Sequence, residues 1–270
     1  MLNCLHRPAF PVLLALFFAA LCVFSGCGSE NRQMLPSPTP TIPLPPAVPA
    51  AEPVLLYVGT GTSPADVSAI QNVLRTSSIG FATADASGLT ALKKEELGGY
   101  KLIIIPGGNS ITIGDSLSQE VASNIRIAVQ HYGTNYLGIC AGAFFGGLSF
   151  HNGVNLTGGV AFNFYADESK GIHKSAVEIS FPSSNPLDVY WEDGPQLSGW
   201  GEVVAKFPDG TPAITQGKSG EGFVVFTGVH LEAPESWRGT LVFGDPASAS
   251  LDYAATVMQA ALNGSSLPHF

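Results

Sequence analysis

Short apolar runs that alternate with stretches of helical periodicity constrain the fold of this chain more than any other feature. Strands are predicted at residues 53–58, 79–84, 102–105 and 135–139. Unbroken apolar strands of this kind are typical of a parallel sheet that helices cover on both faces. We therefore predict an α/β fold, a three-layer α/β/α sandwich of the flavodoxin-like type with a mostly parallel sheet.

Helices are predicted between these strands. Ser63 and Pro64 form a helix start signal, and apolar residues then recur on one helical face. A longer helix is predicted from about Ser116 to Tyr132. The segment 153–200 is expected to add strands or loops over the sheet edge. In such a fold the functional loops lie at the carboxyl ends of the strands.

The first 26 residues resemble a bacterial lipoprotein signal peptide. Arg7 makes the start weakly basic, residues 11–23 are almost wholly apolar, and small residues precede Cys27. The resemblance implies cleavage before Cys27 and a diacylglycerol on its sulfur. That anchor would hold the protein in the cell envelope, at the outer membrane facing the periplasm in a Gram-negative host. A secretory signal or a single membrane anchor is the alternative, but the apolar run is short for a spanning helix.

The remaining chain divides into a linker and one domain. Residues 27–53 are rich in proline and are predicted to form an extended tether between the membrane and the domain. Residues 54–264 have a length that suits a single domain with a sizeable core. The formal net charge of −9, without clusters of basic residues, argues against a nucleic-acid-binding surface.

Cys140 is the candidate nucleophile. Two of the four cysteines fall in the signal peptide and Cys27 is the lipidation site, so Cys140 has no partner for an intrachain disulfide. Glycines flank it at minus two and plus two, after an apolar run. This is the pattern of a nucleophile elbow, a strained strand-to-helix turn that only small neighbours allow. The alternative is a buried cysteine that acts as a small hydrophobe.

Two other segments supply groups that could act with this thiol. Pro106, Gly107 and Gly108 follow the third strand, and a turn without side chains can aim backbone N–H groups at a reacting oxygen. His230 and Glu232 follow an apolar run at 223–226 and provide an imidazole and a carboxylate. A packed or solvated histidine is the alternative. No metal-ligand spacing is present, so neither a metal nor a cofactor is expected.

Together these motifs resemble the class I glutamine amidotransferase-like superfamily. The resemblance is closer to the N-terminal domain of eukaryotic-type biotin–protein ligases, and it covers about residues 54–262. Leu231 stands where that family usually has proline. The 270 residues hold no counterpart of the ligase catalytic domain, so biotin transfer is not implied. The segments that carry the closer resemblance are 57–64, 137–143, 191–195 and 228–232.

The resemblance implies a role for each motif. Cys140 would be the nucleophile, His230 the base that takes its proton, and Glu232 the group that orients and charges the imidazole. A thiolate is stabilised at a helix N-terminus and beside an imidazolium. The backbone N–H groups of Gly108 and Ala141 would form the oxyanion hole, where loss of one donor typically costs about 3 kcal/mol. The remaining pocket candidates are Tyr57, Gly59, Gly107, Asn109 and Glu192.

These observations predict a membrane-tethered, cysteine-dependent hydrolase of C–N amide bonds. Its partners would be a small amide or peptide substrate and the membrane that holds the lipid on Cys27. A hydrolase specific for peptides would use the same three residues. The alternative from another class is a non-catalytic binding module that keeps the amidotransferase-like architecture. Nothing in the sequence indicates an oligomeric state.

The Cys27→Ala variant tests the anchor. Without the sulfur, no lipid can be attached, so the protein should leave the envelope membrane fraction as an unprocessed or soluble form. Fractionation and labelling with a radioactive fatty acid measure this. A variant that still partitions with the membrane and takes up label like the parent would contradict the lipoprotein interpretation.

Overall fold

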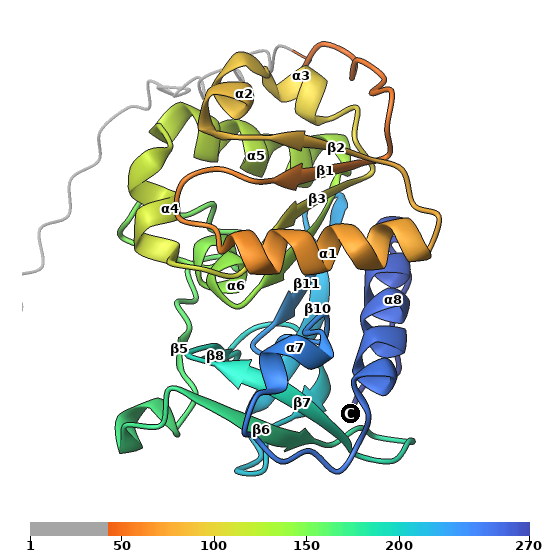
Figure 1. The fold of residues 1–270 in the computed structure, drawn as a ribbon. Coiled ribbons are helices and arrows are strands. Elements are labelled where there is room, and N and C mark those ends of the chain that lie inside the picture. Colours follow the sequence, from red (N-terminus) through yellow and green to blue (C-terminus); the bar gives the residue numbers. More distant parts are fainter. Residues whose placement is uncertain (1–42) are drawn as a thin grey trace, which may run out of the picture. The chain divides into compact units, whose positions relative to one another are not determined.

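The computed structural model describes residues 43–270, of which Leu44–Phe270 form one compact unit. Its centre is a seven-stranded sheet (Figure 1). The strand order is β2 (Phe81–Ala84), β1 (Val54–Tyr57), β3 (Leu102–Ile105), β4 (Asn135–Ile139), β11 (Gly222–Thr227), β10 (Pro212–Ser219) and β9 (Glu202–Lys206). The first five of these strands run parallel, and β10 and β9 continue the sheet in antiparallel fashion. The predicted fold class is confirmed.

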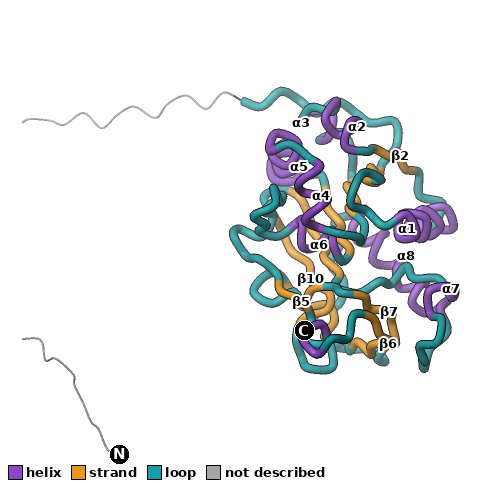
Figure 2. Tube along the Cα trace, turned by 60° about the vertical axis from the view of Figure 1, so that its left-hand side comes forward, coloured by secondary structure: helices purple, strands orange, loops and turns teal. Residues whose placement is uncertain are grey.

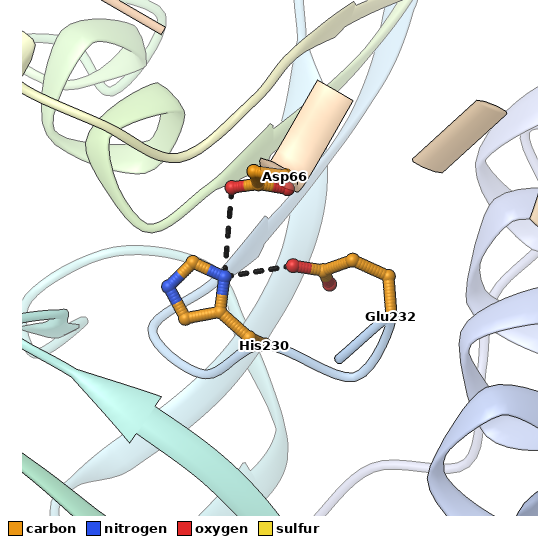
Figure 3. A group of neighbouring side chains, drawn as sticks. All are labelled: Asp66, His230 and Glu232. Atoms are coloured by element: carbon orange, nitrogen blue, oxygen red, sulfur yellow. Dashed lines mark hydrogen bonds and ion pairs between the residues drawn. The ribbon is translucent and has the colours of Figure 1, made fainter. Parts of the chain in front are cut away.

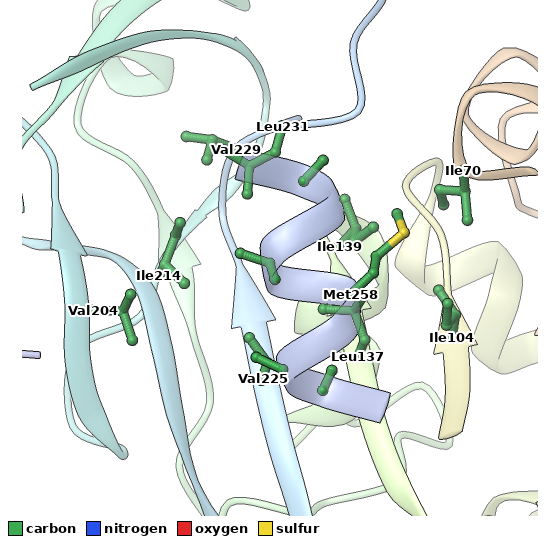
Figure 4. Packing of buried hydrophobic residues seen from close by; sticks show 14 of the residues in the cluster. Ile70, Ile104, Leu137, Ile139, Val204, Ile214, Val225, Val229, Leu231 and Met258 are labelled. Atoms are coloured by element: carbon green, nitrogen blue, oxygen red, sulfur yellow. The ribbon is translucent and has the colours of Figure 1, made fainter. Parts of the chain in front are cut away.

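Both faces of the sheet are buried under helices, which gives the predicted three layers. Leu56 and Ile104 belong to the core cluster under α1 (Pro64–Thr76) and α8 (Ala247–Asn263), and Met258 of α8 packs in the same cluster (Figure 4). Their neighbours Leu55 and Ile103 belong to the cluster on the opposite face. That face is covered by α2 (Ala86–Ala91), α3 (Lys94–Leu97), α4 (Ser110–Ser116), α5 (Gln119–Tyr132) and α6 (Ala141–Gly146). Successive side chains along each strand thus point to opposite faces of the sheet and contribute to both core clusters.

The first residues of two helices show where capping signals in the sequence predict a helix start correctly and where they do not. Helix α1 begins as predicted, with Ser63 Oγ accepting a hydrogen bond from the Asp66 N–H at 3.3 Å. The single helix predicted from about Ser116 is wrong at its start. Helix α4 ends at Ser116 and α5 begins separately, because Ser118 Oγ caps it by accepting from the Val121 N–H at 3.2 Å. Ser118 is therefore a start signal inside the predicted helix.

The middle segment forms two small antiparallel sheets beside the central one. One pairs β5 (Asn163–Phe164) with β8 (Pro195–Gln196), and the other pairs β6 (Lys174–Ile179) with β7 (Leu187–Glu192). A short 3₁₀ turn, Glu168–Lys170, precedes β6. Figure 2 shows β6 and β7 beside α7 (Glu235–Arg238). The hairpin reaches the edge strand β9 through Ser180 and Lys206, and it reaches the chain after β11 through Tyr190 and His230. The segment thus does more than cover an edge.

The domain extends beyond the predicted boundaries at both ends. The Tyr132 hydroxyl donates to the Pro45 carbonyl at 2.8 Å, and the Val48 N–H donates to the Glu95 carbonyl at 2.9 Å. The last part of the predicted tether therefore lies on the domain. After α8, the Leu267 N–H donates to Gln216 Oε1 at 2.8 Å. The predicted signal peptide and the predicted lipidation site Cys27 lie outside the described residues. Among residues 43–270, no helix combines the length and the apolar character needed to cross a bilayer.

Candidate active site

Cys140 lies on a strained elbow between β4 and α6. Its φ and ψ of 48° and −104° are unusual for a residue with a side chain, and its N–H donates to the Thr227 carbonyl at 2.8 Å. A Cβ atom on Gly138 would collide with the Gly142 carbonyl, and one on Gly142 would collide with the carbonyl of Ile105. Both flanking glycines are thus required for the chain to pass so close to itself.

Glu232 fixes the ring of His230. Nδ1 of His230 lies 2.7 Å from Glu232 Oε1, and both side chains are buried (Figure 3). The His230 N–H donates to the Tyr190 carbonyl at 2.8 Å, which ties this loop to β7. The rings of Tyr190 and Trp237 meet the imidazole edge-on, with centroids 6.0 and 5.8 Å away. With Nδ1 engaged, Nε2 is the ring nitrogen that remains for other chemistry.

Leu231, where the family usually has proline, does not disturb this arrangement. It is 2% exposed and packs in the core cluster beneath α8, together with Val229 (Figure 4). A proline would restrict the turn between His230 and Glu232 by fixing its φ angle. Here the core packing of the Leu231 side chain holds that turn in place. The two functional side chains still meet.

Asp66 belongs to this cluster, although no sequence pattern predicted it. This residue lies in the first turn of α1 and is 1% exposed. Its Oδ2 accepts a hydrogen bond from the Gly107 N–H at 2.6 Å and lies 3.5 Å from His230 Nδ1 (Figure 3). A Cβ atom on Gly107 would collide with Asp66 Oδ2 and crowd His230 Cε1. Gly107 is therefore the position that lets the carboxyl and the imidazole approach each other.

Two pKa values in this cluster depart from their ordinary range. Burial raises the pKa of Asp66 well above its usual value, and the nearby charge of Glu232 raises it further. Burial alone would lower the pKa of His230, but the charges of Glu232 and Cys140 outweigh it and hold that pKa well above 6.5. Both shifts favour the protonated form of the group concerned.

Cys140 and His230 line the same cavity, which has a volume of about 460 Å³. The thiol of Cys140 donates to the Glu192 carbonyl at 3.5 Å. A second cavity of about 230 Å³ adjoins at Cys140, Gly108 and Asp193. The thiol therefore lies where two hollows meet. The first is also lined by Ser63, Asp66, Tyr190, Glu192 and Trp237, and the second by Asn109, Ile111, Phe144, Phe164, Glu168 and His173.

The two predicted oxyanion donors are placed next to this thiol. Gly108 lines both cavities and Ala141 lines the second. Neither backbone N–H donates to any acceptor among residues 43–270. Gly108 has φ of +141°, and a Cβ there would collide with the Gly61 carbonyl, so the turn needs glycine. Two N–H groups without an internal acceptor can bind a substrate oxygen.

The other pocket candidates divide into two groups. Asn109 and Glu192 line the cavities, and Gly107 lies behind them against Asp66. Tyr57 and Gly59 line neither cavity, which corrects the prediction. The Tyr57 ring is 1% exposed in the core, its hydroxyl donates to the Thr60 carbonyl at 3.2 Å, and Gly59 lies against that ring. Strand alternation turns Tyr57 into the layer away from the thiol.

Asp66, His230 and Glu232 also have the spacing of potential metal ligands, since one ligand atom from each lies within 4.8 Å of the others. The geometry fits hydrogen bonding better. The 2.7 Å separation of Nδ1 and Oε1 leaves room for a proton between them, and Asp66 Oδ2 is already occupied by the Gly107 N–H. We therefore treat the three groups as a proton-linked cluster.

Comparison with solved structures places this fold among glutamine amidotransferase-like proteins. A crystal structure of a glutamine amidotransferase matches 67% of this chain and 90% of its own, with 20% identity and a TM-score of 0.52. The crystal structure of SMU.1228c matches 78% and 99% of the two chains, with 14% identity and a TM-score of 0.51. At these identities the likeness concerns the fold alone.

The sequence comparison adds the family. Residues 52–178 match the family model described as biotin-protein ligase, N terminal. This match agrees with the resemblance that the motifs indicated, and the fold is glutamine amidotransferase-like. The match includes Asp66, Gly108 and Cys140 and ends before His230 and Glu232. No curated protein sequence matches the chain significantly.

The Gly107→Ala variant tests the packing of this cluster without removing a functional side chain. The added methyl group should displace Asp66 and His230. Alkylation of Cys140 by iodoacetamide at pH 7 should then slow by roughly tenfold, a loss of about 1.4 kcal/mol in thiolate stabilisation.

Gly217→Ala is the matched control, because a Cβ there meets the Trp200 ring at 3.4 Å and the Gly201 Cα at 3.6 Å, which are ordinary contacts. Cys140 in Gly217→Ala should be alkylated at the same rate as in the parent. In both proteins that rate should exceed the rate of an unperturbed thiol. Equal rates in the parent and Gly107→Ala, with both folded, would contradict the proposed coupling between Gly107, His230 and the thiol.

Proposed function

We propose that this protein is a cysteine-dependent hydrolase of C–N amide bonds in which Cys140, His230 and Glu232 act together. The observation that carries the proposal is the buried His230–Glu232 pair, 2.7 Å apart, in the cavity that also holds Cys140 on a strained elbow. If His230 were only a packed core residue, neither the strained backbone at Cys140 nor the cavity beside the ring would be needed. The amidotransferase-like fold supports the reaction class.

The first half of the reaction would acylate the enzyme. Cys140 transfers its proton to His230 Nε2, and the thiolate attacks the amide carbon. The oxyanion of the tetrahedral intermediate accepts hydrogen bonds from the N–H groups of Gly108 and Ala141. When the C–N bond breaks, the imidazolium gives its proton to the departing nitrogen, so the amine leaves neutral and an acyl-thioester remains on Cys140.

The second half would release the acid. His230 takes a proton from a water molecule, and the hydroxide attacks the thioester carbonyl at the same oxyanion site. The C–S bond then breaks, the carboxylic acid leaves, and the thiol is restored. Glu232 keeps Nδ1 protonated throughout and stabilises the imidazolium. One imidazole therefore serves as acid and base in turn.

The lining of the two cavities favours substrates that carry a positive charge. Glu192 and Asp193 line the first cavity, and Glu168 and Asp193 line the second, whereas no described lysine or arginine lines either. The described lining groups that can carry a positive charge are His230 and His173 alone, so an ammonium group would find more partners of opposite charge than a free carboxylate would. Phe144 and Phe164, with ring centroids 5.0 Å apart, offer an apolar surface next to these acids. This supports an amino-bearing amide or peptide fragment as the substrate.

We also propose that the enzyme works in the cell envelope, held by a lipid on Cys27. The support is the sequence alone: an apolar run, small residues and a cysteine, followed by a proline-rich segment. An envelope location favours a peptide fragment of the envelope over a precursor in nucleotide synthesis as the substrate. Residues 44–53 of the predicted tether belong to the compact unit Leu44–Phe270, so the proposed tether would be its remaining part, residues 27–43.

Removal of Cys140 and His230, singly and together, and substitution of Glu232 test whether the three residues act as one unit. The Cys140→Ala variant should abolish turnover, and His230→Ala should lower it by about 10²- to 10⁴-fold. The double variant should be scarcely worse than Cys140→Ala, because the imidazole has no task without the thiol. The Glu232→Gln variant should lose less than His230→Ala, since it keeps an oxygen that can face Nδ1.

The measurement is release of ammonia or amine from a panel that contains glutamine, asparagine, generic amides and isoglutamine-containing muropeptides. Glu235→Gln, whose side chain is 78% exposed on α7, is the control and should match the parent. If no compound is turned over while one binds equally well to the parent and to Cys140→Ser, the protein is a binding module and the proposal is wrong.

A further inference from the structure

We infer that Asp66 is a positioning residue that acts as a neutral carboxylic acid and joins the Gly107–Gly108 turn to the His230–Glu232 pair. The inference deepens the proposed hydrolase and rests on it for the catalytic consequence. The protonation state of Asp66 can be measured without any substrate. The buried carboxyl group makes two close contacts through Oδ2, one with the Gly107 N–H at 2.6 Å and one with His230 Nδ1 at 3.5 Å.

The first contacts clamp the glycine turn to the start of α1. The Ser63 N–H donates to the Gly107 carbonyl at 2.9 Å, and the Gly107 N–H donates to Asp66 Oδ2 at 2.6 Å. Both polar groups of the Gly107 peptide are thus satisfied by the first turn of one helix. Gly108 follows directly, so the clamp sets the direction of the N–H that would bind the oxyanion.

The surroundings of Asp66 decide its charge. The titratable groups near it are His230 and Glu232 on the loop after β11, with Cys140, Tyr190, Glu192 and Asp193 across the cavity. The turn at 105–109 and the rest of the first helical turn contribute none. One cation therefore faces two buried carboxyl groups.

A single proton resolves this imbalance. If Asp66 were ionised beside Glu232, the cluster would carry a second buried negative charge without a partner, which is costly. Burial and the charge of Glu232 both raise the pKa of Asp66, in agreement with this. Asp66 Oδ1, which is buried and has no hydrogen-bond partner among the described residues, is the oxygen free to carry the proton.

The neutral state has a consequence for catalysis. With Asp66 protonated, the imidazolium of His230 is balanced by one carboxylate, Glu232, at 2.7 Å. A second ionised carboxylate at 3.5 Å would hold the proton on His230 more strongly. The imidazolium would then be a weaker acid toward the departing amine. The proton on Asp66 thus sets the acidity of His230 while its other oxygen holds the glycine turn.

The pH dependence of thermal unfolding in Asp66→Asn tests the charge. As pH rises from 4 to 7, Asp66 ionises in the unfolded parent but stays protonated in the folded parent, so the parent loses stability and the asparagine variant does not. The melting temperature of Asp66→Asn minus that of the parent should therefore increase over this range. A difference that is constant or decreases would show an ionised Asp66 and overturn the inference.

Two further variants keep the result interpretable. Asp66→Ala also lacks the titrating group, so it should show the same rising difference even from a lower melting temperature. Asp85→Asn is the opposite control. Hydrogen bonds from the Gly88 N–H and from Ser87 lower the pKa of this exposed cap residue, so the parent gains stability with pH and the Asp85→Asn difference should decrease.

Reactivity separates positioning from a structural role. The pH midpoint of Cys140 alkylation in Asp66→Asn should stay within about 0.3 units of the parent, because no charge beside His230 is lost. A midpoint lowered by a full unit would show that an anionic Asp66 supports the imidazolium, and it would overturn the inference. These readouts do not depend on turnover, so they stand even if the proposed hydrolase fails.

The catalytic consequence needs a substrate from the panel. Turnover should fall by about tenfold or more in Asp66→Ala, which releases the Gly107 N–H, and most of that loss should be recovered in Asp66→Asn, which keeps an acceptor there. Equal loss in both folded variants would overturn the positioning role. Absence of turnover in the parent itself would count against the proposed function and not against the charge of Asp66.

Discussion

The hydrogen bond between His230 Nδ1 and Glu232 Oε1 determines what the rest of this site can do. The imidazole ring is buried, and this hydrogen bond fixes its orientation. Nε2 is then the only ring nitrogen that can act elsewhere. Burial opposes charge on the ring, so the positive state survives only because an anion is adjacent. The strained Cys140, the glycine turn and the buried carboxyl group of Asp66 are all arranged around the imidazole ring held in this position.

Close approach of backbone segments makes this arrangement possible. Glycine at 138 and 142 allows the elbow, and glycine at 107 and 108 allows the turn to lie against Asp66 and the Gly61 carbonyl. These positions come from different strand ends that the parallel sheet brings to one edge. The small β6–β7 hairpin then closes the site by pairing Tyr190 with His230. The sheet topology brings these segments together, and the glycines, which have no side chains, allow their backbones to pack closely.

Much of this could be predicted from residue patterns, because the signals are local. The apolar runs at Leu102–Ile105 and Asn135–Ile139 match β3 and β4, and Ser63 caps α1 as expected. The predictions that were wrong concern features that depend on contacts between residues far apart in the sequence. Tyr57 ends an apolar run at the right sheet edge, but strand alternation turns its ring into the core. Residues 44–53 look like free linker, yet partners far along the chain hold them.

Asp66 shows the limit most clearly. Ser63 and Asp66 have the spacing of a capping box, in which the acidic side chain reaches back to the N–H of the cap. The structure gives that N–H to the Gly107 carbonyl and turns the Asp66 carboxyl toward Gly107 and His230. No local pattern distinguishes the two outcomes. Only the position of β3 beside β1 does, because it brings the glycine turn to the start of α1.

The coupling between Cys140 and His230 is central to the proposed reaction, and the protonation of His230 measures that coupling most directly. Nitrogen-15 NMR of the histidine ring, followed across pH in the parent and in Cys140→Ser, reports it without a substrate. We expect the imidazolium to persist well above pH 6.5 in the parent and to titrate at a lower pH in Cys140→Ser, where the charge of the thiolate is lost. A neutral His230 at pH 7 in the parent, or identical titrations in both proteins, would contradict the account.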